Sequence, residues 1–184
     1  MNRSKLLVAL AGGAAMLFVG TLVGAATMQT RADYTAARNH SSAEYKQAQA
    51  KCEPLDGHER NMCVVEAKAG EKRAKATAEA NFRGTVKAKT DSQIANADAD
   101  YMVAKVACDI RTDAERDMCV KEAHATQIKQ VADAKANKTS VDAHADAREE
   151  TRDVQYKGAL AKCDAMSATD KTACVNSAKS AYGK

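Results

Sequence analysis

The stretch that decides the fold is YMVAKVACDIRTDAERDMCVKEA, residues 101–123, in which the second cysteine follows the first by eleven positions. The chain carries this pattern three times, at intervals of 56 and 55 residues. In each copy a Tyr stands seven residues before the first Cys, and a Val follows the second Cys directly. Such repetition predicts one structural unit built three times. The residues are Tyr45, Cys52 and Cys63; Tyr101, Cys108 and Cys119; and Tyr156, Cys163 and Cys174.

The spacing within a copy predicts two helices joined by a tight corner. Upstream of Cys108, the residues Ile94, Ala97, Tyr101 and Ala104 step by three or four positions, as along one face of a helix. A continuous helix would hold the two cysteines of a copy about 16 Å apart. A disulfide needs Cα atoms only about 4.4–6.8 Å apart. The chain must therefore turn between the two cysteines if they form a bond.

The cysteines are predicted to form three disulfides, one within each repeat. Six cysteines allow about 15 connectivities, and the pairs Cys52–Cys63, Cys108–Cys119 and Cys163–Cys174 are favoured because each copy carries its own pair. No Cys-x-x-Cys is present, so the spacing of a redox motif or zinc finger is missing. Each copy also has a helix-start pattern resembling a capping box between its cysteines. These patterns are Asp56-x-x-Glu59, Thr112-x-x-Glu115 and Ser167-x-x-Asp170, and the acid–base pairs Glu59-Arg60, Glu115-Arg116 and Asp170-Lys171 are interpreted as matching the helix dipole.

Two further breaks are expected between the repeats, at residues 82–85 and 137–140. Thr85 and Ser140 are N-cap candidates, and each stands 16 residues before the next repeated Tyr. Thr30-x-x-Asp33 plays the same part at the start of the first copy. The third copy has a poorer apolar face, with Glu149 and Arg152 on it. We predict an all-α fold of three disulfide-linked helical hairpins, arranged as a bundle or as an extended array. The predicted helices span residues 31–54, 57–82, 86–110, 113–138, 141–165 and 168–182, and the hairpin repeats span 26–84, 85–139 and 140–184.

The N-terminus resembles an export signal. Arg3 and Lys5 are followed by an uncharged apolar run, and Val23-Gly24-Ala25 offers the small residues that signal peptidase requires. Residues 1–25 are therefore predicted to be a signal peptide, which places the remaining chain in the periplasm. The alternative is an uncleaved anchor in the inner membrane formed by residues 6–26, the only segment for which we expect membrane contact.

The composition predicts a thin core. Of the 184 residues, 45% count as hydrophobic, but 40 are Ala, which removes little apolar surface from water. From residue 26 onward, Leu, Ile, Val and Phe together number only 16. The net charge is +4 for the whole chain, and the signs are interspersed rather than gathered in a basic face. Nucleic-acid binding and an enzyme with a deep apolar pocket are therefore not expected.

At these repeats the chain resembles small exported bacterial envelope proteins that are rich in Ala and Lys and carry Tyr/Cys-paired helical hairpins. The matching pattern runs from Tyr45 through Cys52-Glu53 to Cys63-Val64-Val65-Glu66-Ala67, and again from Tyr101 to Ala123. The third copy departs from it, with Asn176-Ser177 before Ala178. Such proteins are commonly labelled as similar to the Tol-system envelope protein TolA. This resemblance implies no catalytic residues and no Tol function for a chain without an evident C-terminal globular domain.

These observations favour a non-enzymatic structural or protein-interaction protein of the cell envelope, whose partner is an envelope protein or a cell-wall component. No catalytic residue, cofactor or metal ligand is predicted, because the sequence lacks the motifs that carry such chemistry. The alternative is a periplasmic binding or chaperone-like module for a small ligand, a metal or an unfolded client. The methionines motivate this alternative, although core filling also explains them: Met62, Met102, Met118 and Met166.

Overall fold

The computed structural model describes residues 30–184, and the predicted signal peptide or membrane anchor lies outside the described residues. This part of the chain is all-α, as predicted, and contains five α-helices and one short 3₁₀ helix. The elements are α1 (Arg31–Cys52), α2 (Gly57–Arg83), α3 (Val86–Ala107), η1 (Cys108–Ile110), α4 (Asp113–Asp164) and α5 (Ala168–Tyr182).

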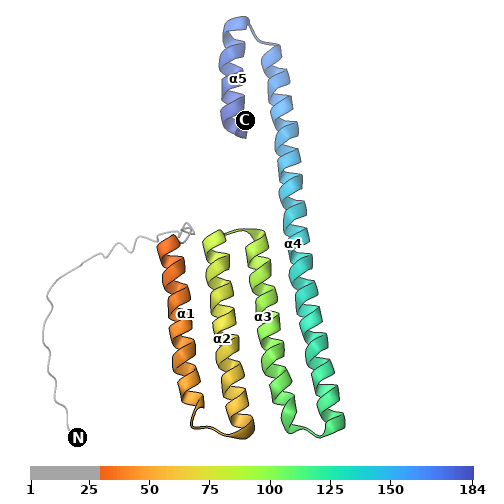
Figure 1. Ribbon diagram of the computed structural model, residues 1–184. Coiled ribbons are helices and arrows are strands. Elements are labelled where there is room, and N and C mark those ends of the chain that lie inside the picture. The colour runs from red at the N-terminus through yellow and green to blue at the C-terminus, as the bar shows by residue number, and fades with distance from the viewer. Residues whose placement is uncertain (1–29) are drawn as a thin grey trace, which may run out of the picture.

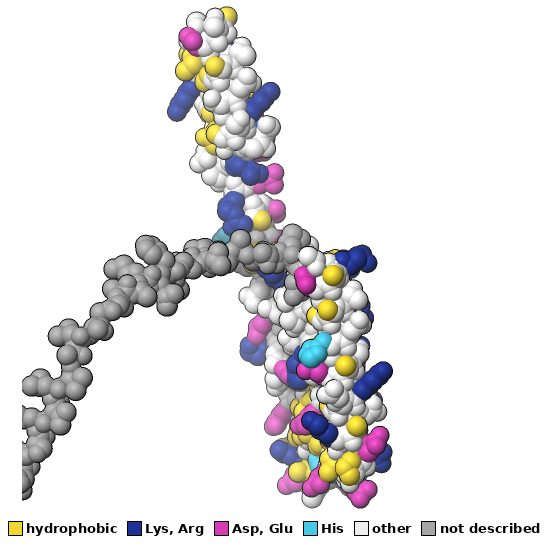
Figure 2. Space-filling view, turned by 90° about the vertical axis from the view of Figure 1, so that its left-hand side faces the viewer, with side chains coloured by type: hydrophobic (Ala, Val, Ile, Leu, Met, Phe, Trp, Pro, Cys, Tyr) yellow, Lys and Arg dark blue, Asp and Glu magenta, His cyan; other side chains and the backbone are white. Residues whose placement is uncertain are grey.

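The helices form an extended array rather than a bundle. Helices α1, α2, α3 and the first half of α4 lie side by side in one row, and α5 runs back along the far end of α4 (Figure 1). Among the helices that the structure describes, extensive packing occurs only between those that follow one another in the chain. Seen from the α1 edge, the row is narrow, and side chains of both charges are scattered over it (Figure 2). The row therefore exposes two broad faces, and its interior consists only of the seams between neighbouring helices.

Small side chains line these seams and explain the close packing of the row. On α3, Ala88, Ser92 and Ala99 are buried on one side of the helix, while Thr90 and Ala97 are buried on nearly the opposite side. Two such sides let α3 contact α2 and α4 at once. The largest fully buried side chains are three cysteines, one at each corner: Cys52, Cys108 and Cys163. The thin core predicted from composition is thus a set of Ala-rich seams with a disulfide at one end of each hairpin.

Two of the predicted helix starts are capped as expected. Thr30 and Asp33 form a reciprocal capping box at the start of α1. Thr85 accepts a hydrogen bond from the backbone N–H of Ala88 at the start of α3. At the three corners the predicted N-cap residues occupy the cap position, but their side chains make no capping hydrogen bond to the backbone. These residues are Asp56, Thr112 and Ser167.

The predicted break at residues 137–140 is wrong. The two helices expected at 113–138 and 141–165 are a single helix, α4, of 52 residues, so residues 30–184 contain five α-helices instead of the six predicted. Ser140 is therefore not an N-cap but an interior helical residue, and the boundary placed between residues 139 and 140 falls inside a helix. The third hairpin consequently consists of the second half of α4 and the whole of α5.

The physical reason lies in the residue that ends the preceding helix. At the first junction Gly84 caps α2 in the left-handed conformation, with φ +63°, and this allows α3 to fold back. The corresponding residue at the second junction is Thr139, whose β-branched side chain disfavours that conformation. The chain has no residue there that reverses its direction, and the helix continues.

The segment after residue 140 also lacks an apolar face that could pack against the first half of α4. In α3, Ala97 is 2% exposed in the seam, and Ile94 is half-buried. One repeat of 55 residues later these positions hold Arg152 and Glu149. Folding this segment back against α4 would bury two charged side chains, which is costly unless each finds a partner. The segment instead stays in water as part of the long helix.

Candidate functional site

The three disulfide-closed corners share one geometry. The bonds are Cys52–Cys63, Cys108–Cys119 and Cys163–Cys174, the pairs that the spacing favoured, with Cα–Cα distances of 5.6, 5.8 and 5.6 Å. The first cysteine of each pair lies at the end of the incoming helix, and the second is the seventh residue of the outgoing helix. The corner folds back over this first stretch of the outgoing helix. Each bond therefore fixes the angle between the two helices of its hairpin.

An ion pair crosses two of the corners. Asp109, directly after Cys108, lies 2.7 Å from Arg116, and Asp164, directly after Cys163, lies 2.9 Å from Lys171. The sequence pattern predicts that these bases match the dipole of their own helix, and the structure shows that they also pair across the corner. The sequence could have predicted these ion pairs, since the acid and the base are seven residues apart in both copies. All four side chains are partly exposed, so each pair contributes at most about 1 kcal/mol.

The repeated tyrosines lie between the helices of their hairpins and are half-buried. The Tyr101 ring lies 5.5 Å from the ring of His124, and Tyr156 lies 6.1 Å from Tyr182. Tyr45 lines a shallow groove between α1 and α2 together with Gly70. Their surroundings are those of packing residues within each hairpin.

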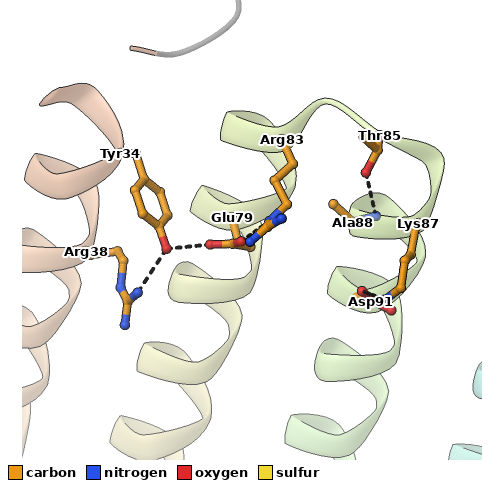
Figure 3. A network of polar contacts seen from close by, with 8 residues as sticks. All are labelled: Tyr34, Arg38, Glu79, Arg83, Thr85, Lys87, Ala88 and Asp91. Carbon is orange, nitrogen blue, oxygen red and sulfur yellow. Dashed lines mark hydrogen bonds and ion pairs between the residues drawn. The ribbon is translucent and has the colours of Figure 1, made fainter. Parts of the chain in front are cut away.

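A polar network that the sequence did not predict ties the start of α1 to the end of α2 (Figure 3). The Tyr34 hydroxyl donates to Glu79 and accepts a hydrogen bond of 2.9 Å from Arg38, while Glu79 also pairs with Arg83. The Tyr34 ring stacks on Phe82 at 4.7 Å. The hydrogen bonds from Tyr34 and then Arg83 lower the pKa of Glu79. This network fixes the end of the hairpin opposite to its disulfide.

Asp98 on α3 connects three helices. It lies 2.9 Å from Lys72 of α2 and accepts a hydrogen bond of 2.7 Å from Gln127 of α4. The hydrogen bond from Lys72 is the main reason why the pKa of Asp98 is lowered, and Gln127 adds to the effect. Next to it Arg73 of α2 pairs with Asp100 of α3. These contacts hold the second hairpin against the first.

Within residues 30–184, no group of three or more His, Cys, Asp or Glu side chains is arranged to hold a metal ion. In the same part of the chain, no helix has both the length and the apolarity needed to span a membrane. The hollows that the described surface offers include open grooves along the seams, lined mainly by Ala and by polar or charged side chains together with Tyr45 or Tyr182. What the described residues present to other molecules is therefore broad, charged helix faces.

The fold and these surfaces define a class of disulfide-linked helical-hairpin protein. Comparison of the chain with protein-family models, with curated proteins and with solved structures finds no match.

Proposed function

We propose that this protein is an exported, non-enzymatic structural or protein-interaction component of the bacterial cell envelope. The observation that carries the proposal is the single row of helices, because it exposes two broad faces relative to a very small interior. Exposed side chains of both charges are scattered along the described helices, and charge complementarity suits recognition of a protein or cell-wall polymer. The disulfides keep this thin arrangement rigid.

The proposed location rests on the cysteines and the N-terminus together. All six cysteines are paired in disulfides, and such bonds persist in oxidising compartments such as the periplasm. The N-terminal sequence supplies an export signal, and residues 6–26 would serve as a membrane anchor if that segment is not cleaved. The resemblance to small exported Ala/Lys-rich proteins agrees with this location.

Site-specific photocrosslinking in the intact envelope tests the proposal. A photoreactive residue replaces exposed Lys68 or exposed Thr77, which lie on opposite sides of α2, one on each broad face. The matched control is Ala134, which is buried in the seam between α3 and α4. We expect a discrete adduct from an exposed position and none from the control. Absence of adducts from both exposed positions, together with an unaltered envelope in a deletion strain, would overturn the proposal.

A second candidate function is binding of unfolded clients. Large apolar side chains are exposed beside two corners: Ile110 is 72% exposed, Met118 63% and Met166 48%. Exposed flexible methionines suit binding to varied apolar segments. An aggregation assay with a reduced, unfolding client distinguishes this function. Suppression that is lost in the Ile110→Ser/Met118→Ser variant favours it, and an absence of suppression by the unaltered protein removes it.

A further inference from the structure

The middle of α4 has no neighbouring helix. All residues from Ala143 to Arg152 are exposed, and we call this segment the unpaired stretch. On one side of it, the pairing of Cys108 with Cys119 sets the register of α3 and places its first residue, Val86, near Val141. On the other side, Lys184 reaches only to Asp153, at 2.5 Å. The resulting gap between α3 and α5 is visible in Figure 1.

The charges near the unpaired stretch repel one another within the helix. In the described chain, six Lys or Arg side chains pair with an acid four residues away, which supports a helix, and the last of these pairs, Lys138 with Asp142, lies just before the unpaired stretch. Around the unpaired stretch, residues four apart carry the same charge, which opposes helix formation. The like-charged pairs are Asp142 and Asp146, Asp146 and Glu150, Glu149 and Asp153, and Arg148 and Arg152.

These charges are also separated by sign around the helix. At about 100° per residue, the acids and the bases form two strips whose centres lie about 140° apart. The acidic strip consists of Asp142, Asp146, Glu149, Glu150 and Asp153, and the basic strip of His144, Arg148 and Arg152. Helices α3 and α5 pack on the side of α4 between the two strips, so one strip belongs to each broad face of the molecule. The strips are exposed except for Asp142 and Asp153, which are half-buried, and the basic strip lines an open groove beside the end of α5.

We propose that the unpaired stretch binds a second copy of this chain, with the acidic strip of one copy against the basic strip of the next. The argument is charge complementarity, because each copy carries both strips. At the ends of the acidic strip Asp142 pairs with Lys138 and Asp153 with Lys184. Between them, Asp146 and Glu150 have no ion pair among residues 30–184. Arg148 has no ion pair among residues 30–184, and Arg152 has only a loose one, 3.8 Å from Glu149. Since the two strips are different surfaces, the contact is head-to-tail and repeats as an open stack of molecules.

Two charge-reversed variants test the proposal by sedimentation of the purified, fully oxidised protein. The first variant is Arg148→Glu/Arg152→Glu, which leaves two acidic strips, and the second is Asp146→Lys/Glu150→Lys, which weakens the acidic strip and adds basic charge to it. We expect the unaltered protein to associate at about 20 mM salt and at least about tenfold more weakly at 500 mM, because salt screens exposed charges. Each variant alone is expected to remain monomeric, and an equimolar mixture is expected to form mixed complexes.

The mixture separates loss of the contact from loss of folding, since misfolded variants would not restore association. Lys46→Glu/Lys51→Glu on α1 changes the net charge by the same amount as the first variant, and its association is expected to be unchanged. If the unaltered protein is monomeric at low salt, the proposal is overturned. The candidate ligand of the acidic strip is then a different, basic protein. Variants that associate alone as well as the unaltered protein also overturn it. Failure of either kind leaves the proposed envelope function standing, because that function is tested on an external partner.

Discussion

The two junctions between repeats begin from similar sequence but end in different structures. At residues 82–85 the chain reverses at Gly84, and α3 packs closely along α2. At residues 137–140 it continues as helix, and the third hairpin stands away from the row at the end of α4 (Figure 1). The difference teaches that one left-handed residue, together with a buriable face on the next helix, decides whether a repeat joins the array side by side or end to end.

The largest effect is expected from reducing all three disulfides. Each closes a short loop and contributes about 3 kcal/mol by loop-entropy arguments, against a typical domain stability of about 5–15 kcal/mol. With seams made mostly of Ala, the reduced protein is expected to lose most of its helical signal at moderate temperature. Circular dichroism melts with and without reductant measure this, and superimposable curves would contradict the role given to the bonds.

Removing single disulfides sharpens the comparison between the row and the third hairpin. In Cys163→Ala/Cys174→Ala, α5 is expected to detach and exchange its amide hydrogens rapidly, because its extensive packing is against α4 alone. In Cys108→Ala/Cys119→Ala, α3 keeps its seam with α2, and protection is expected to persist there. Hydrogen exchange with residue resolution measures both variants. Equal loss of protection in α3 and α5 would show that position in the array does not matter.

Replacing Gly84 by Thr places at the first junction the residue found at the second. Because Gly84 has φ +63°, a β-branched side chain there is expected to cost about 2 kcal/mol. Gly158→Ala is the matched control. Gly158 lies inside α4 with open space around the position of an added Cβ, so this change is expected to stabilise by up to about 1 kcal/mol. Urea unfolding measures both, and a Gly84→Thr variant as stable as the parent would refute the explanation of the turn.

The smallest effect concerns the polar contacts that hold the two hairpins of the row together. The pKa of Asp98 is lowered in the folded protein. Its ionised carboxylate therefore adds to the free energy of unfolding above the pKa of the unfolded chain, and this stabilisation is lost as pH falls through the lower pKa of the folded protein. Asp98→Asn is expected to cost about 0.5 kcal/mol at neutral pH, as for a partly exposed pair. It should also flatten the decline in stability below about pH 4. Denaturation midpoints at a series of pH values measure this, and parallel curves for parent and variant would exclude it.

Most of the local structure could be predicted from the sequence because the repeats contain short-range signals. The corners, the in-repeat cysteine spacing and the caps at Thr30 and Thr85 all depend on residues within about a dozen positions of each other. The wrong prediction of a break at residues 137–140 depends on polar residues that are typical of helix starts. The stronger signals were a missing glycine and the charges of Glu149 and Arg152, which argued for a continuous helix.

The contacts between helices could not be predicted in the same way. The network of Tyr34 with Glu79 and the bridging role of Asp98 depend on which helix ends and faces meet across more than 25 residues of chain. The repeat pattern does not specify these contacts, since neither Tyr34 nor Asp98 has a counterpart with the same role in all three copies. The ion pairs across the corners could have been predicted from the sequence, because the spacing of seven residues between acid and base occurs in two copies.

The most direct test of the central claim, that α4 is one continuous helix carrying the third hairpin away from the row, is small-angle X-ray scattering. The measurement is made on the oxidised protein at high salt. A helix of 52 residues is about 78 Å long at 1.5 Å per residue, so the maximum dimension is predicted to be at least about that value. A break near residue 139 that folded the third hairpin into a compact bundle would instead give a radius of gyration of about 15 Å and a maximum dimension well below the length of α4. That result would contradict the account.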